Sequence, residues 1–219
     1  MKKAFIWLVL MAMVLCCGCV PQTSPEGGTT TTAGSTGHYF KADPANGEAY
    51  NAAITAYDTF LSGNQPAAGS TGVSEIYIGQ LTTVNGTNGI DAFGLWDVNG
   101  DGIPELHTRS THLDVFTFKN GKVVHLLTSP FSYLNATVKV TANGTVFGKQ
   151  DGTGTFYFVT RYVDGAPLTL RFSCLETAEV SDYSVDGTAM EKEAWEAATA
   201  AYRALEAEPE AVTWINWTK

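Results

Sequence analysis

The chain has 219 residues, with 13 lysines and arginines against 22 aspartates and glutamates, and a formal net charge of −9. This balance argues against a nucleic-acid-binding protein, whose affinity comes mainly from basic side chains facing phosphates. Apolar residues make up 44% of the sequence and charged residues 16%, which supplies enough material for a packed core and excludes a chain that is disordered throughout.

The first residues have the pattern of an export signal. Lys2 and Lys3 precede an apolar run over residues 4–15. The run is too short to span about 30 Å of hydrocarbon and is typical of the apolar region of a signal peptide. The sequence therefore predicts export from the cytoplasm.

Three cysteines close this apolar run. Gly18 followed by Cys19 resembles the bacterial lipobox, in which the cysteine is lipidated and becomes the mature N-terminus. We expect residues 1–18 to be a lipoprotein signal peptide and Cys19 to be the lipidation site, with Cys17 as the alternative register. An ordinary signal peptide with incidental cysteines is the other interpretation. Lipidation predicts a protein anchored to the cell membrane by an N-terminal acyl group and facing the extracellular side.

The rest of the chain divides into a tether and one domain. Residues 19–45 are rich in Thr, Gly, Ser and Pro and cannot bury enough apolar surface to offset their chain entropy, so we expect a flexible tether. Residues 46–219 carry no second linker and are long enough to form a single domain without disulfides. Cys174 lies in an apolar run of this domain and is expected to be a buried small hydrophobe rather than a nucleophile.

The domain is expected to begin and end with helices. Apolar residues recur at helical spacing over residues 49–61, and Gly63 is placed to end that helix. Thr188 and Glu191 have the spacing of a capping box before a second amphipathic stretch, which Pro209 stops. A final extended segment covers residues 212–217.

Strands punctuated by turns fill the region between the helices. Asn120-Gly121, Asn143-Gly144 and Asp164-Gly165 each separate β-prone runs and favour type I′ hairpin turns. Pairing across these turns places Phe118 opposite Val123, Phe116 opposite His125, Val115 opposite Leu126, Tyr157 opposite Phe172 and Val159 opposite Leu170. The sequence thus predicts an α+β fold, an antiparallel β-meander sheet packed with an N-terminal and a C-terminal helix.

The sharpest motif is the acidic segment over residues 97–106. Oxygen donors alternate at Asp97, Asn99 and Asp101, the backbone carbonyl of Ile103 adds another, and Glu105 returns at the ninth position. Calcium takes six to eight oxygen ligands, so this spacing predicts a calcium site formed by these five residues.

The surroundings of this segment distinguish between known calcium loops. An EF-hand would need a Glu at the twelfth position, which is Thr108, and flanking helices, whereas residues 93–96 read as a strand. The loop instead resembles the calcium loops of FG-GAP (integrin-type) repeats, with Asn99 and Glu105 in place of the usual aspartates. Only one clear copy is present, so the resemblance implies a metal site and not a propeller. An acidic turn that binds no metal is the alternative.

A second segment, Asp182 to Glu193, also has EF-hand spacing. It lacks a convincing entering helix, and Asp186-Gly187 before Thr188 reads equally as a turn followed by a helix cap. Whether this segment binds a second ion stays open.

A broader resemblance rests on three segments. Residues 57–63 (YDTFLSG), 92–106 (AFGLWDVNGDGIPEL) and 116–122 (FTFKNGK) resemble a set of uncharacterised secreted lipoproteins of Gram-positive anaerobes, which share a helix ending near "FLxG", a "DxDGDGIPEL" loop and a "TYKNGK" hairpin. The resemblance implies secretion, anchoring and a calcium loop, and it brings no catalytic residues.

Other patterns give weaker signals. His107, His112 and His125 lie at spacings that favour packing over a zinc site, and no spacing rule selects a catalytic pair among Glu75, Asp91 and Asp114. Trp96, Trp195, Trp214 and Trp217 would suit a sugar-stacking platform, although aromatic residues in amphipathic patterns are more typical of a core.

These features together predict a function outside the cell. We expect a membrane-anchored extracellular lipoprotein whose calcium-stabilised domain binds a glycan, peptide or protein without catalysis. A secreted glycan-directed hydrolase with unidentified carboxylates and a structural component of the envelope are the alternatives.

Overall fold

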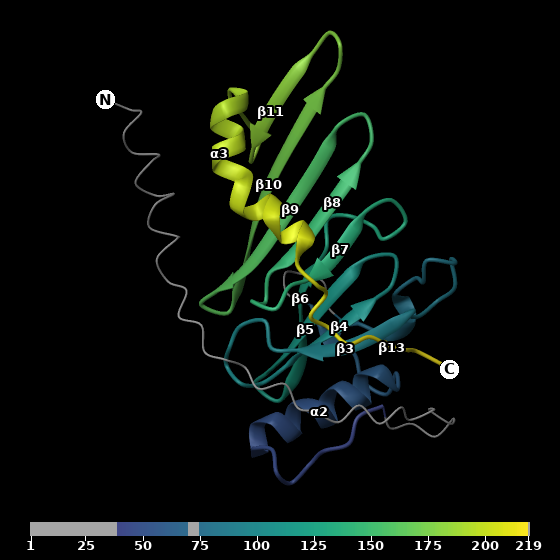
Figure 1. Ribbon diagram of the computed structural model, residues 1–219. Coiled ribbons are helices and arrows are strands. Elements are labelled where there is room, and N and C mark those ends of the chain that lie inside the picture. Colours follow the sequence, from purple (N-terminus) through teal and green to yellow (C-terminus); the bar gives the residue numbers. More distant parts are fainter. Residues whose placement is uncertain (1–38, 70–74, 219) are drawn as a thin grey trace. The chain divides into compact units, whose positions relative to one another are not determined.

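The computed structural model describes residues 39–69 and 75–218, which belong to one compact unit. The expected signal peptide, Cys19 and residues 19–38 of the expected tether lie outside the described residues. Two α-helices, α2 (Glu48–Leu61) and α3 (Lys192–Arg203), and two 3₁₀ turns, η1 (Ile78–Gln80) and η2 (Ala204–Ala207), accompany thirteen strands in this part of the chain (Figure 1). The domain is therefore α+β, with β-structure predominant.

The strands form two sheets rather than the single meander sheet that the turn pattern predicts. The first sheet has the order β13-β3-β4-β5-β6-β1-β2, and the second has the order β12-β11-β10-β9-β8-β7. All neighbours are antiparallel except β1 and β6, which pair in parallel through Ala68 and Val124. The bounds in the first sheet are β1 (Ala67–Ala68), β2 (Glu75–Ile76), β3 (Ala92–Trp96), β4 (Glu105–Arg109), β5 (Leu113–Lys119), β6 (Lys122–Thr128) and β13 (Ile215–Asn216). Those in the second are β7 (Thr137–Val140), β8 (Val146–Asp151), β9 (Thr155–Val163), β10 (Ala166–Glu176), β11 (Ser181–Val185) and β12 (Thr188–Ala189).

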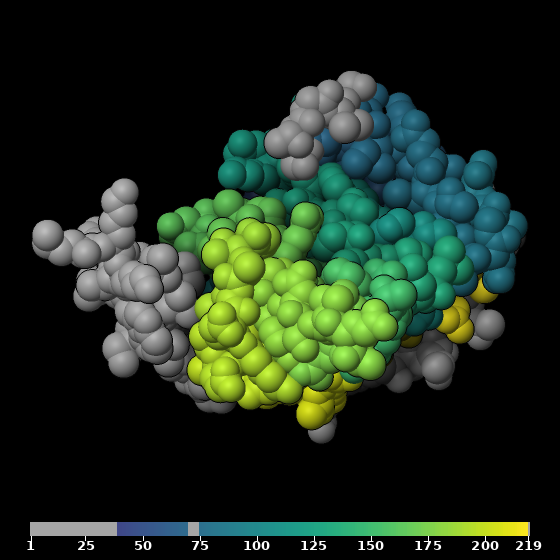
Figure 2. All heavy atoms as spheres, turned by 90° about the horizontal axis from the view of Figure 1, so that it is seen from above, coloured from purple at the N-terminus to yellow at the C-terminus, as the bar shows by residue number. Residues whose placement is uncertain are grey.

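Three apolar clusters show how these elements are layered. The first cluster joins α2 to one face of the first sheet, and the third joins α3 to one face of the second sheet. The second cluster lies between the sheets, where Leu113 and Val115 of β5 meet Val146 and Phe158 of strands β8 and β9. Atoms of β10, β11 and α3 form one continuous surface in the space-filling view (Figure 2). Strands β4 and β5 are thus buried over most of their length, and this buried surface includes the polar side chains of Glu105, His107 and Asp114.

Helix α2 matches the helix expected over residues 49–61. Its apolar stripe is buried, and Gly63, with φ of 76°, ends it by donating its N–H to the carbonyl of Phe60 at 2.9 Å. Tyr39 and Phe40, which belong to the expected tether, pack their rings edge-on against Phe93 with centroids 5.4 Å away. Packing within the described part of the chain therefore already includes Tyr39 and Phe40, which precede residue 46.

Helix α3 begins later than the capping pattern predicts. Thr188 lies in strand β12 opposite Val185, and Asp186-Gly187 between them form a tight turn with φ values of 47° and 76°. Glu191 is the N-cap residue of α3, so the prediction of a Thr188 cap is wrong. Asp-Gly satisfies a type I′ hairpin turn here, and the helix starts only after the short return strand.

The other turns fix the strand register. Asn120 and Asp164 have φ values of 53° and 51°, as type I′ turns require, and the pairs Phe118–Val123, Phe116–His125, Tyr157–Phe172 and Val159–Leu170 are all confirmed.

Two details of the predicted hairpins are wrong. Val115 pairs with Leu127 instead of Leu126, because the register shifts at a bulge between Val115 and Phe116. The hairpin at Asn143 is present but has a wider turn, closed by a hydrogen bond from the N–H of Thr141 to the carbonyl of Thr145 at 2.9 Å. Asn143 does not have the positive φ of a type I′ turn.

The C-terminal segment links the two sheets. The ammonium group of Lys139 on β7 donates to the backbone carbonyls of Glu206 and Glu208, which end η2. Beyond them, Val212 enters the cluster between the sheets and approaches Gly94 of β3 so closely that a Cβ there would lie 2.4 Å from it. The segment then joins the first sheet as β13, which fixes the position of Trp217 next to β3.

Candidate functional site

Four of the five residues predicted to bind calcium lie on the loop between β3 and β4, and the fifth, Glu105, begins β4. Trp96, the last residue of β3, pairs with Glu105, the first residue of β4, and residues 97–104 form the connection. The flanking elements are strands, as expected for this motif and unlike an EF-hand. The structure brings Asp97, Asn99 and Glu105 together through hydrogen bonds around this loop.

Asp97 is the acceptor around which the loop turns. Its Oδ1 accepts the N–H of Gly100 at 2.7 Å, and its Oδ2 accepts the N–H of Gly102 at 2.9 Å. Both glycines have positive φ, 76° and 84°. No atom lies within 4 Å of a Cβ built on either glycine, so glycine is favoured by backbone conformation and not by lack of space.

Asn99 and Asp101 repeat the same local geometry. Asn99 Oδ1 accepts the N–H of Asp101 at 2.9 Å, and Asp101 Oδ1 accepts the N–H of Ile103 at 2.8 Å. Together with Asp97, these contacts turn four oxygens of three side chains toward the backbone of one loop. Each oxygen has two lone pairs, so a hydrogen bond to the backbone leaves capacity for a cation.

Glu105 closes the base of the loop from inside the domain. Its side chain is 0% exposed. Oε2 accepts the N–H of Val98 at 3.0 Å, while Oε1 accepts both the side-chain amide of Asn99 at 2.8 Å and the hydroxyl of Thr117 at 3.1 Å. The carboxylate therefore holds both ends of the loop and the neighbouring strand β5.

The environment makes Glu105 a weak acid. Burial is the main cause that raises the pKa of this carboxyl from 4.5 to about 7, and the nearby charges of Asp101 and Asp97 act in the same direction. Hydrogen bonds from Val98 and Thr117 favour the charged form and partly offset the rise in pKa. Glu105 therefore keeps its proton to a higher pH than an exposed glutamate does.

Two buried phenols lie close enough to Glu105 to feel its charge. Burial raises the pKa of Tyr57 on α2 and of Tyr162 on β9, and the charge of Glu105 is the second cause for each. Tyr57 donates its hydroxyl to the carbonyl of Phe116 at 3.4 Å. The loop is thus coupled to both α2 and the second sheet.

The hairpin between β7 and β8 supports the loop from the second sheet. A Cβ built on Gly144 would lie 2.4 Å from the carbonyl oxygen of Val98, and Gly144 has φ of 75°. Only glycine allows the two backbones to approach this closely. The Asn143-Gly144 dipeptide predicts a turn, but its role beside the loop depends on a contact between distant parts of the sequence.

The donor set matches calcium in chemistry. Asp97, Asn99 and Asp101 each offer side-chain oxygen atoms, two of them as carboxylates, and calcium is a hard cation that prefers such ligands. The Glu105 carboxylate is directed at Val98 and Thr117, so it braces the loop in this structure. No group of three or more His, Cys, Asp or Glu side chains is arranged to hold a metal within residues 39–69 and 75–218.

The second EF-hand-like segment has a different structure. Asp182 lies in β11, Asp186 in a hairpin turn and Glu193 in the first turn of α3. Asp186 Oδ1 accepts the N–H of Arg171 at 2.8 Å, which is a hairpin contact. The segment is therefore organised as strand, turn, strand and helix rather than as one loop.

The histidines occupy separate environments. His107 is 0% exposed, its Nε2 lies 3.3 Å from the carbonyl of Trp96, and burial lowers its pKa to about 4. His125 Nε2 lies 3.2 Å from Asp114 Oδ1, and its ring lies 5.1 Å from that of Phe116. They act as core and sheet-packing residues, as the sequence favours.

The carboxylates considered for hydrolysis are also separated. Asp114 is buried and bonded to His125, Glu75 on β2 is exposed, and Asp91 accepts the N–H of Val84 at 3.0 Å. Cys174 is half-buried beside the third apolar cluster and is a free thiol.

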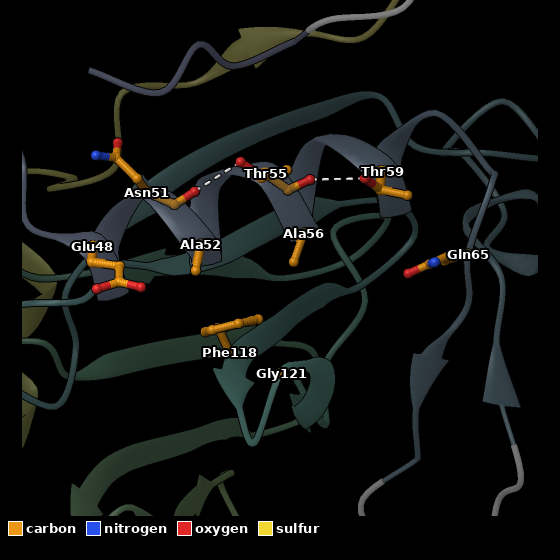
Figure 3. Close-up of a pocket in the computed structure, with 9 residues that line it drawn as sticks. All are labelled: Glu48, Asn51, Ala52, Thr55, Ala56, Thr59, Gln65, Phe118 and Gly121. Carbon is orange, nitrogen blue, oxygen red and sulfur yellow. Dashed lines mark hydrogen bonds between the residues drawn. The ribbon is translucent and has the colours of Figure 1, made fainter. Parts of the chain in front are cut away.

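The described domain also has two surface pockets, neither of which is lined by residues of the β3–β4 loop. The first is a groove of about 610 Å³ between α2 and the β5–β6 hairpin, into which Ala52 and Ala56 point toward Phe118 (Figure 3). The hydroxyls of Thr55 and Thr59 along it donate to helix carbonyls at 2.9 and 2.8 Å. Glu48 and Gln65 add polar side chains at the rim of the groove.

The second pocket, of about 400 Å³, lies where residues 83–91 meet Trp217. The sequence gives only an indirect signal for it, a stretch of Asn, Thr and Gly between residues 82 and 89 that reads as turns. The partner of this stretch, Trp217, lies far away in the sequence.

Comparison of the chain with protein-family models, curated proteins and solved structures finds no match. Among the described residues, no helix is long and apolar enough to cross a membrane.

Proposed function

We propose that the protein is a membrane-anchored extracellular lipoprotein whose domain is stabilised by calcium at the β3–β4 loop and binds an extracellular partner. The observation that carries the proposal is the loop itself. Asp97, Asn99 and Asp101 turn their oxygens toward one short stretch of backbone, and the buried Glu105 holds the base of that stretch.

Calcium bound at the loop should raise the free energy of unfolding, because it relieves repulsion between carboxylates. Two carboxylates about 5 Å apart repel by roughly 3 kcal/mol at an effective dielectric constant of about 20, before screening by salt. A divalent cation bound between Asp97 and Asp101 removes this repulsion. It also favours the charged form of Glu105, whose pKa is raised by burial to about 7. Extracellular calcium sites of this kind bind with dissociation constants on the order of 10⁻⁴–10⁻³ M.

A thermal melt with and without a calcium chelator tests this part of the proposal. The wild-type protein should melt several degrees higher in millimolar calcium, and Asp101→Ala should melt at the same temperature in both conditions. Asp182→Ala, in the second acidic segment, is the matched control and should keep the calcium response. Identical wild-type melting in calcium and chelator would overturn the calcium site.

The anchor rests on the Gly18-Cys19 pattern after the apolar run. Cys19→Ala should move the protein from the membrane to the soluble fraction, while Cys17→Ala, the matched control, should leave it in the membrane pellet. Release by Cys17→Ala alone would assign lipidation to Cys17. Release by neither variant would contradict a lipid anchor.

Binding is favoured over catalysis by the described pockets. Glycoside hydrolysis needs two carboxyl groups on either side of the scissile bond. Each of the two pockets is lined by a single carboxylate, Glu48 in one and Asp91 in the other.

A further inference from the structure

The pocket beside Trp217 is built by two segments that are distant in sequence. One is the connection between η1 and β3, and the other is the C-terminal segment that carries β13. The pocket measures about 400 Å³, within the range of small-molecule sites. It is lined by Thr83, Asn85, Thr87, Asn88, Ile90, Asp91 and Trp217.

The connection between η1 and β3 is held in one conformation although most of it is exposed. Thr82 and Asn88 form a β-bridge, the N–H of Thr83 donates to the carbonyl of Thr87 at 2.8 Å, and the N–H of Gly89 donates to the carbonyl of Leu81 at 2.7 Å. These bonds make a small hairpin whose tip lies outside the apolar clusters.

Further hydrogen bonds tie this hairpin to Asp91, which precedes β3, and to the β4–β5 connection. Asp91 Oδ2 accepts the N–H of Val84 at 3.0 Å, and the N–H of Trp217 donates to the carbonyl of Asp91 at 3.0 Å. The N–H of Thr111 donates to the carbonyl of Thr82 at 2.8 Å. An exposed polar hairpin that is fixed in this way is preorganised, which lowers the entropy cost of binding.

Trp217 forms the aromatic wall of the pocket. Gly89 lies against its ring, with φ of 123°, and a Cβ there would fall 2.4 Å from the indole Cζ3. Pairing of Asn216 with Ala92 fixes the backbone that carries the indole. Any residue larger than glycine at position 89 would push the hairpin away from the ring, so this glycine is needed for the wall and the polar rim to meet.

The polar rim offers hydrogen-bonding groups that the protein does not use. The side-chain amides of Asn85 and Asn88 have no hydrogen-bond partner among the described residues, and both residues are exposed. Each amide supplies donors and an acceptor, and Asp91 adds a carboxylate. Hydroxyl groups on a ligand would therefore find both donors and acceptors at fixed positions.

The composition of the pocket selects the class of ligand. No Lys, Arg or His lines it, and Asp91 and the net charge of −9 disfavour anions. Only Ile90 and Trp217 are large apolar residues, which is too little for a lipid chain. A sugar ring has hydroxyl groups for the amides and an apolar C–H face that packs on an indole, so it matches both walls.

We propose that this pocket binds a neutral sugar ring of an extracellular glycan. The proposal names the ligand for the binding role proposed above and rests on that role, but it does not depend on calcium occupancy of the β3–β4 loop.

A glycan array probed with the full chain in detergent tests the proposal, with neutral, sulfated and sialylated glycans side by side. The wild type should bind neutral glycans, and titration calorimetry on the strongest of these should give one site per chain. Asn88→Ala should weaken binding about fivefold to tenfold, because it removes one or two hydrogen bonds. Asn135→Ala, another exposed asparagine away from the pocket, should bind as the wild type does.

Trp217 is tested by two variants, because its removal also takes away packing. Trp217→Ala should abolish measurable binding, and Trp217→Phe, which keeps an aromatic face, should retain weakened binding and a wild-type-like melting curve. Absence of neutral-glycan binding by the wild type, binding of anionic glycans or peptides only, or unchanged affinity in Asn88→Ala and Trp217→Ala would overturn the site. A calcium-dependent melt without glycan binding refutes the pocket alone, whereas glycan binding with a calcium-independent melt refutes the calcium loop alone.

Discussion

Glu105 and His107 on strand β4 are expected to make opposite contributions to the pH dependence of the free energy of unfolding. Both side chains are fully buried, and burial is the main cause of the shifted pKa of each. The pKa of Glu105 rises from 4.5 to about 7, and that of His107 falls from 6.5 to about 4. Replacing each by glutamine separates the two effects, since glutamine has similar size and does not titrate.

The sign of each effect follows from proton uptake. Between pH 4.5 and 7 the folded chain keeps a proton on Glu105 that the unfolded chain has lost, so stability falls as pH rises through this range. Between pH 6.5 and 4 the unfolded chain protonates His107 while the folded chain does not, so stability falls as pH falls. Each shift corresponds to about 3 kcal/mol, and the two effects nearly cancel in the wild type.

Urea unfolding of the full chain in detergent and chelator, from pH 4 to 8, measures both effects. Relative to the wild type, Glu105→Gln should lose about 3 kcal/mol of additional stability on acidification from pH 7 to 4.5. His107→Gln should instead gain about 3 kcal/mol relative to the wild type on acidification from pH 6.5 to 4. Curves that run parallel to the wild type in both variants would refute the argument that these two side chains titrate in opposition.

Three further predictions concern the packing around the site. Gly148→Ala places a Cβ 1.9 Å from the ring of Phe158 and should lower the free energy of unfolding by about 3 kcal/mol or more, as measured by urea titration. In the control Gly79→Ala the new Cβ has no atom within 4 Å, so the free energy of unfolding should change by less than about 0.5 kcal/mol. Lys139→Met removes two charge-assisted hydrogen bonds to the end of η2 and should cost about 2–3 kcal/mol, with faster amide exchange in residues 204–208; unchanged exchange would contradict the contact. Gly144→Ala should push the β7–β8 hairpin away from the β3–β4 loop and weaken calcium binding in a calorimetric titration. An affinity equal to that of the wild type would show that the hairpin does not support the loop.

Features with a local cause could be predicted from the sequence. Asn120-Gly121 and Asp164-Gly165 determine their hairpins because few other dipeptides adopt positive φ at both turn positions. The helix ending at Gly63 follows from apolar spacing within one segment. The two-sheet arrangement could not be predicted in this way, because the choice of sheet for each hairpin depends on contacts between β5 and β9, far apart in the chain.

In the candidate sites, too, only the features with a local cause could be predicted from the sequence. The spacing of Asp97, Asn99 and Asp101 predicts a calcium site on the β3–β4 loop, but it does not show that Glu105 turns inward to Val98. That orientation depends on strand pairing and on a hydroxyl of β5. The pocket beside Trp217 could not be predicted either, because its wall and its rim meet only after β13 pairs with β3.

A crystal structure of the protein grown in millimolar calcium tests the central claim most directly. The account predicts an ion on the β3–β4 loop, 2.3–2.6 Å from oxygens of Asp97, Asn99 and Asp101. A well-ordered loop without an ion, in which these oxygens bind only their own backbone N–H groups, would contradict it.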